Sequence, residues 1–208
     1  MLDRVVLPAA QGFIGEERTM VEEYLTTNRD RKFRSLIAIG DASQQYQDMA
    51  RRLGHHYVCV DPHLAPGLAG RPPATDPDPG GLLLRRRLDT VLPEHLPVGP
   101  AVWIFHFNVF PYLDATLDIL TELCAADDLI AIATWSKTVE AFENRAVYDR
   151  CLERHTRNDA AQAAESPLTR RRISVALPPH RNHTTLRGRF VDVRLLDVLP
   201  ETDREFPL

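Results

Sequence analysis

Two short apolar runs, separated by a segment of helical periodicity, constrain the fold of this chain more than any other feature. Residues 36–39 (LIAI) and 57–60 (YVCV) are uninterrupted and have the length of strands that are buried on both faces. Between them, apolar side chains recur at helical spacing at Ala42, Tyr46, Met49, Ala50 and Leu53. This order predicts two parallel strands joined by a right-handed helical crossover.

Turn-forming and capping residues mark the ends of these elements. Gly40 ends the first run, Asp41 and Ser43 are candidate caps of a helix that starts at once, and Gly54 stands where a left-handed residue ends a helix. Asp61 ends the second strand. Parallel strands present their carboxyl ends at one edge of a sheet, where α/β proteins bind ligands. Gly40 and Asp61 are therefore predicted to lie side by side at that edge.

These two positions favour an adenosine-containing cofactor. Gly40 lets a ligand approach the backbone, the predicted helix start offers free amides, and the two oxygens of Asp61 can accept both hydroxyls of a ribose. The segment GDASQQ keeps one glycine where a dinucleotide fingerprint has three. A cofactor without a pyrophosphate therefore fits better than a nicotinamide dinucleotide.

Residues 37–43 (IAIGDAS) and 58–61 (VCVD) resemble the first two motifs of the class I S-adenosylmethionine (SAM) dependent methyltransferases. As an order of elements, the resemblance extends over residues 35–199. It implies an α/β fold with a Rossmann-like, mostly parallel seven-stranded sheet that is flanked by helices and ends in an antiparallel hairpin. The second and third glycines that this family usually has in the first turn are absent here.

The resemblance also implies which residues contact SAM. The glycine turn would lie under the methionine part, the acidic end of the second strand would hold the ribose, and an acidic residue after the third strand would lie near the adenine amino group. The residues so implied are Gly40, Asp41, Ala42, Asp61, Asp89 and Phe107.

The second informative stretch begins with residues 101–105 (AVWIF), which are typical of a central strand. In the resembled family the chain after this strand passes beside the transferable methyl group. The resemblance therefore implies a reaction site with His106 as the base and with Asn108 and Tyr112 orienting the acceptor. The alternative for His106 is a core histidine that is satisfied by a backbone carbonyl.

The chain is expected to consist of an N-terminal arm and lid helix, residues 1–34, and a methyltransferase-like α/β domain, residues 35–208. A helix is predicted over residues 16–26. The resemblance implies that it is part of a lid, with Gly12 and Gly15 as hinges, and the alternative is a helix packed on the sheet without ligand contact. Further expected elements, in chain order, are a proline-rich loop at 62–81, a strand at 82–89, a helix from Asp114, a strand at 129–134, a helix at 139–164, and two hairpin strands at 173–177 and 189–199 around a turn at 178–183.

No metal site is predicted. Cys59, Cys124 and Cys151 are widely spaced and odd in number, which indicates reduced packing residues and not a disulfide or a zinc site. His180 and His183 have no carboxylate or thiol nearby in the sequence and are interpreted as surface histidines.

Composition restricts the partners. The net charge of −4 argues against general nucleic-acid binding. No apolar run approaches membrane-spanning length and the first residues lead into no signal-peptide core, so a cytoplasmic protein is expected. The expected partner is a small-molecule substrate, and a homodimer is left open.

The sequence therefore predicts a SAM-dependent methyltransferase that acts on a small-molecule acceptor. Two alternatives stay open: an enzyme that uses SAM without methyl transfer, closing its amino group onto the aminobutyl chain and releasing methylthioadenosine, and a non-catalytic binding protein of the same fold. A nicotinamide-dependent oxidoreductase is disfavoured by the missing glycine fingerprint.

Overall fold

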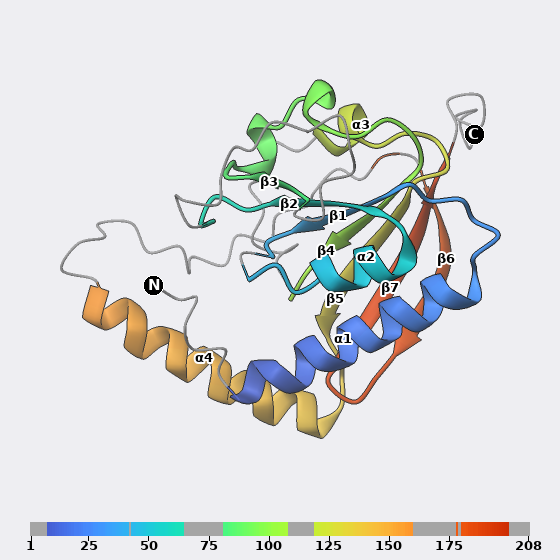
Figure 1. The fold of residues 1–208 in the computed structure, drawn as a ribbon. Coiled ribbons are helices and arrows are strands. Elements are labelled where there is room, and N and C mark those ends of the chain that lie inside the picture. Colours follow the sequence, from blue (N-terminus) through green and yellow to red (C-terminus); the bar gives the residue numbers. More distant parts are fainter. Residues whose placement is uncertain are drawn as a thin grey trace, which may run out of the picture.

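The computed structural model describes residues 8–41, 43–64, 81–107, 119–159, 178 and 180–199 of the 208-residue chain. In chain order, the elements shown in Figure 1 are α1 (Pro8–Thr27), β1 (Ser35–Ile39), α2 (Gln47–Leu53), β2 (His56–Val60), β3 (Leu82–Leu84), β4 (Ala101–Phe105), α3 (Ile119–Leu123), β5 (Leu129–Trp135), α4 (Val139–Asp159), β6 (His180–Arg187) and β7 (Val191–Val198). Two short 3₁₀ turns, Leu88–Thr90 and Pro93–His95, lie between β3 and β4.

One seven-stranded sheet organises these elements in the order β3-β2-β1-β4-β5-β7-β6. The strands from β3 to β5 are parallel, and β7 runs antiparallel to both of its neighbours. This arrangement confirms the predicted fold class, an α/β fold with a mostly parallel seven-stranded sheet that ends in an antiparallel hairpin. The strand order reverses between β1 and β4, and the crevice outside such a reversal is where open α/β sheets bind ligands.

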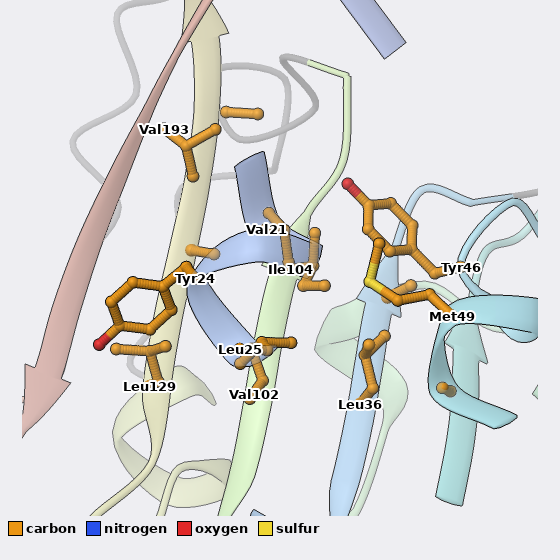
Figure 2. Close-up of a cluster of buried hydrophobic side chains, with 14 of the residues drawn as sticks. Val21, Tyr24, Leu25, Leu36, Tyr46, Met49, Val102, Ile104, Leu129 and Val193 are labelled. Atoms are coloured by element: carbon orange, nitrogen blue, oxygen red, sulfur yellow. The ribbon is translucent and has the colours of Figure 1, made fainter. Parts of the chain in front are cut away.

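Helices cover both faces of the sheet. Helices α1, α2 and α4 lie on one side and α3 lies on the other (Figure 1). The core under α1 and α2 includes Val21 and Leu25 of α1, which lie beside Ile104 and Val102 of β4 (Figure 2). The intervening strand residue Trp103 belongs to the second core, on the face of α3. Strands β1 and β4 are buried at every position, which is why their sequences are continuously apolar.

Three boundaries differ from the sequence predictions. Helix α1 begins at Pro8, so Gly12 and Gly15 lie inside it and are not hinges at its start. Helix α2 begins only at Gln47, because the residues after Gly40 form a turn. Strand β3 ends at Leu84, since the exposed arginines that follow leave the sheet and lead into a 3₁₀ turn.

The hairpin is confirmed but its turn was misplaced. Residues 180–183, predicted as part of a turn, belong to β6, and the turn lies at residues 188–190. Strand β6 is the edge strand and is mostly exposed, so it carries a polar sequence that resembles a loop. The predicted strand at 173–177 and most of the loop at 62–81 lie outside the described residues.

The β6–β7 turn is held by one carboxylate of α1. Glu16 accepts hydrogen bonds from the backbone amides of Arg189, Phe190 and Val191, at 2.8, 2.6 and 3.0 Å. On the same side of α1, Gly12 lies against the ring of Phe190, where an added Cβ would be 3.2 Å from Cε2. These contacts attach α1 to the side of the sheet that β6 and β7 form.

Replacing Glu16 by alanine is expected to lower the free energy of unfolding by about 1–3 kcal/mol, because three amides lose a charged acceptor. Urea unfolding followed by circular dichroism measures the change. Glu23→Ala, at an exposed position of the same helix, is the control and should change little. Equal stability of the two variants would contradict the role of Glu16 in holding the turn.

Candidate functional site

Three strand ends meet at the carboxyl edge of the sheet. Ile39 of β1 pairs with Val60 of β2 on one side and with Phe105 of β4 on the other, so the next residues, Gly40, Asp61 and His106, share that edge. The amide of Gly40 donates to Val60 O at 3.0 Å, and the amide of His106 donates to Ile39 O at 3.2 Å. The prediction that Gly40 and Asp61 lie side by side is confirmed, and the reversal of strand order puts His106 next to them.

Gly40 and Asp61 each have a local structural reason for their residue type. Gly40 has a φ of 81°, in the left-handed region that favours glycine. Asp61 is 5% exposed, and its Oδ1 accepts a 2.6 Å hydrogen bond from the amide of His63. Its own amide donates to Leu84 O at the end of β3. The carboxylate is thus oriented at the edge, and its contact with a ribose stays a prediction.

The turn after Gly40 is organised from inside by Asp41, which is fully buried. Its Oδ1 accepts from the amide of Gln45 at 2.8 Å, and its Oδ2 accepts from the amide of Tyr46 at 3.0 Å and from the hydroxyl of Tyr57 at 2.8 Å. The amide of Gln44 donates to the carbonyl of Asp41 at 2.9 Å. The amides of Gln44, Gln45 and Tyr46 are therefore satisfied within the protein, and Ala42 lies outside the described residues.

A carboxylate that the sequence analysis missed lies at the centre of the site. Glu17 of α1 is fully buried. Its Oε1 accepts from the hydroxyl of Tyr46 at 2.5 Å and lies 3.0 Å from Nδ1 of His106, while Oε2 accepts from the amide of Phe107 at 3.0 Å. The available signal was an acidic residue in the apolar stripe of a predicted helix, between Phe13 and Val21 at a spacing of four.

The charges of this network shift the pKa of two side chains. Burial lowers the pKa of His106, but the charge and hydrogen bond of Glu17, with the charge of Asp41, raise it by more, so the net shift is upward. Burial, with the charge of Glu17, raises the pKa of Tyr46 well above its usual value, so the phenol stays protonated and donates. Nδ1 of His106 is the ring nitrogen that faces the carboxylate of Glu17. His106 is therefore partnered by a carboxylate, not by the backbone carbonyl of the alternative interpretation.

Four aromatic rings pack beside His106. Phe13 of α1 contacts Phe107 and Trp135 edge-on, with ring centroids 5.1 and 4.8 Å apart, and Phe107 contacts Tyr148 of α4 at 5.0 Å. Phe107 has a φ of 47°, an uncommon value for a residue with a side chain. This aromatic cluster (Phe13, Phe107, Trp135 and Tyr148) joins α1 and α4 to the ends of β4 and β5.

Of the remaining predicted site residues, the structure describes only Asp89. Asp89 lies in the 3₁₀ turn after β3 and forms an ion pair with Arg87 at 2.9 Å, and its contact with an adenine stays a prediction. Asn108 and Tyr112 lie outside the described residues. His183 pairs with Asp197 at 3.0 Å, at the opposite edge of the sheet. Within the described ranges, no group of three or more histidine, cysteine or acidic residues could hold a metal ion.

The raised pKa of His106 predicts a pH-dependent stability. A histidine whose folded pKa lies above its unfolded value of about 6.5 stabilises fully below that value and loses the contribution as the pH rises through the folded pKa. We expect the wild type to lose stability across this interval, and His106→Gln to lose less. Thermal unfolding between pH 6 and pH 9 measures both. The control is His56→Gln, at an exposed position of β2, which should keep the wild-type pH dependence; a His106→Gln profile parallel to the wild type would exclude the ion pair.

Comparison with known proteins gives distant structural likenesses only. No family model and no curated protein sequence matches the chain. The magnesium protoporphyrin IX methyltransferase ChlM of Synechocystis PCC 6803, crystallised with bound SAH, is 12% identical over 94% of this chain and 90% of that one, with a TM-score of 0.49. The 1,6-didemethyltoxoflavin-N1-methyltransferase of Burkholderia thailandensis is 10% identical over 88% and 78%, with a TM-score of 0.44. The plantazolicin methyltransferase BpumL is 12% identical over 95% and 88%, with a TM-score of 0.45. At these values none of the likenesses assigns an activity to this chain.

Proposed function

We propose that this chain is a SAM-dependent methyltransferase that acts on a small-molecule acceptor. The observation that carries the proposal is the juxtaposition of Gly40 and Asp61 at the point where the strand order reverses, with the Glu17–His106 pair at the next strand end. Gly40 has no Cβ, so a ligand can approach its backbone, and the carboxylate of Asp61 can accept hydrogen bonds from the two ribose hydroxyls. This pair of residues therefore suits an adenosine. A net charge of −4 fits a small acceptor better than a nucleic acid.

When bound, SAM supplies an electrophilic methyl group. The chain itself would bind the ribose through Asp61 and remove a proton from the acceptor through His106. Because Nδ1 of His106 faces Glu17, Nε2 is the nitrogen that can take a proton from an acceptor hydroxyl or ammonium group. Glu17 fixes the ring and stabilises the imidazolium that forms, which is the role a carboxylate has beside a catalytic histidine. The aromatic cluster would exclude water beside the reacting groups.

One observation favours a second candidate, an enzyme that uses SAM without methyl transfer. The amides of Gln45 and Tyr46 donate to Asp41 and are not available to the methionine part of SAM. A different pose would suit attack by the amino group of SAM on its own aminobutyl chain, with release of methylthioadenosine. Incubation with SAM alone, followed by mass spectrometry, separates the two: methylthioadenosine indicates cyclisation, and its absence leaves methyl transfer.

Replacing Asp61 by alanine should weaken binding of S-adenosylhomocysteine at least about 100-fold, since two ribose hydroxyls lose a charged acceptor. Isothermal titration calorimetry measures the affinity. Asp48→Ala, at an exposed position of α2, is the matched control and should bind like the wild type. Unchanged affinity in Asp61→Ala would remove Asp61 from the site, and a wild type that does not bind would leave the non-catalytic alternative.

Replacing His106 by glutamine should slow turnover by roughly 10²- to 10⁴-fold, the usual contribution of a general base, with little change in affinity for S-adenosylhomocysteine. The assay follows release of S-adenosylhomocysteine from SAM, with an acceptor identified from a panel of small hydroxyl and amino compounds. Glu17→Gln should slow turnover less and shift its pH profile, because the imidazole loses its charged partner. A parallel loss of cofactor affinity in His106→Gln would make His106 a packing residue.

A further inference from the structure

Arg18 of α1 has an unusual environment beside the candidate site. Its side chain is half-buried, and Nε is one of two buried side-chain polar atoms without a hydrogen-bond partner in the part of the chain that the structure describes, the other being Ser35 Oγ. No ion pair of Arg18 is found there either. A buried N–H without an acceptor costs free energy, so a guanidinium in this position has a reason other than packing.

The neighbours of Arg18 on α1 show what it faces. Glu17 contacts Tyr46, just before α2, and Glu22 pairs with Arg52 in the last turn of α2 at 2.7 Å. Arg18 precedes Glu22 by four residues and therefore shares its face of the helix, one turn closer to the start of α2. Arg18 is thus on the side of α1 that faces the start of α2, and its charge acts on Tyr46 and on His106. Burial and the charge of Glu17 raise the pKa of Tyr46, and the charge of Arg18 partly offsets that rise.

The turn before α2 has no amide left for an anion between residues 44 and 47. The amides of Gln45 and Tyr46 donate to Asp41, that of Gln44 donates to the carbonyl of Asp41, and that of Gln47 donates to the carbonyl of Gln44. A ligand carboxylate at this place needs a donor from elsewhere. A guanidinium offers parallel N–H groups that match the two oxygens of a carboxylate.

We propose that Arg18 binds the carboxylate of the amino-acid part of the cofactor, with Nε and one terminal nitrogen donating to its two oxygens. The inference rests on the proposed function and assigns a residue that lies outside both motifs of the resemblance. Recognition of the anion is thereby transferred from the backbone of the glycine turn to a side chain of α1. The adenosine end remains with Gly40 and Asp61, so the two ends of the ligand are bound by different layers of the fold.

Two ligands that differ only at the amino-acid end test this assignment. S-adenosylhomocysteine carries the carboxylate, whereas methylthioadenosine keeps the adenosine and lacks the amino acid. Arg18→Gln should weaken binding of S-adenosylhomocysteine by about 10- to 100-fold and leave that of methylthioadenosine within about twofold of the wild type. Arg18→Lys should fall between, because an ammonium keeps the charge and loses the parallel donors. Isothermal titration calorimetry measures all six affinities.

The matched control is Arg52→Gln, which removes an arginine that pairs with the same face of α1 and should change neither affinity. Thermal unfolding of each variant establishes that α1 stays in place. Equal loss for both ligands in Arg18→Gln, or no loss for either, overturns the carboxylate subsite while leaving the proposed function intact. Failure of the wild type to bind either ligand overturns the proposed function, and the subsite with it.

Discussion

The arrangement of this site depends on the buried carboxylate of Glu17. A buried charged group is stable only when polar groups of the protein bind it. Here the phenol of Tyr46, the imidazole of His106 and the backbone amide of Phe107 contact the carboxylate of Glu17. They come from the turn before α2 and from the end of β4, two segments that the sheet brings together. Helix α1 can therefore dock in one position only, because any shift would leave Glu17 buried and without partners. The same requirement fixes the ring of His106 at the carboxyl edge.

Contacts on both sides of α1 hold this helix in place beside the site. Glu16 holds the β6–β7 turn on one flank of the helix, and Glu22 holds α2 on the other. Gly12 lies inside the helix and against Phe190, where it permits close packing and not bending. The structure shows α1 packed on the sheet. The ligand contact that separates the two interpretations of this helix stays a prediction, and the contact proposed for Arg18 goes with the first of them. No helix in the described ranges has the length and apolar character needed to cross a membrane.

The sequence predicted best the strands that are almost completely buried, because a continuous apolar run marks each of them. Strands β1, β2, β4 and β5 are buried on both faces, so their apolar runs identified them within two residues, and Gly54 ends α2 in the left-handed conformation as predicted. Strand β6 escaped detection because an edge strand needs no apolar side chains. Glu17 escaped detection because its partner His106 is 89 residues away, and no local pattern reports a contact that only the folded sheet creates.

The single glycine of the first turn now has a structural explanation. Gly40 has a φ of 81°, in the left-handed region that favours glycine, and Gln44 adopts a left-handed φ of 55° although it has a side chain. The buried carboxylate of Asp41 binds the amides of Gln45 and Tyr46 and so stabilises the turn internally. The amides of residues 44–47 are therefore not free to bind an anion. If those amides do not bind the anion, positive charge has to come from another element, and α1 carries Arg18, whose Nε has no hydrogen-bond partner among the described residues.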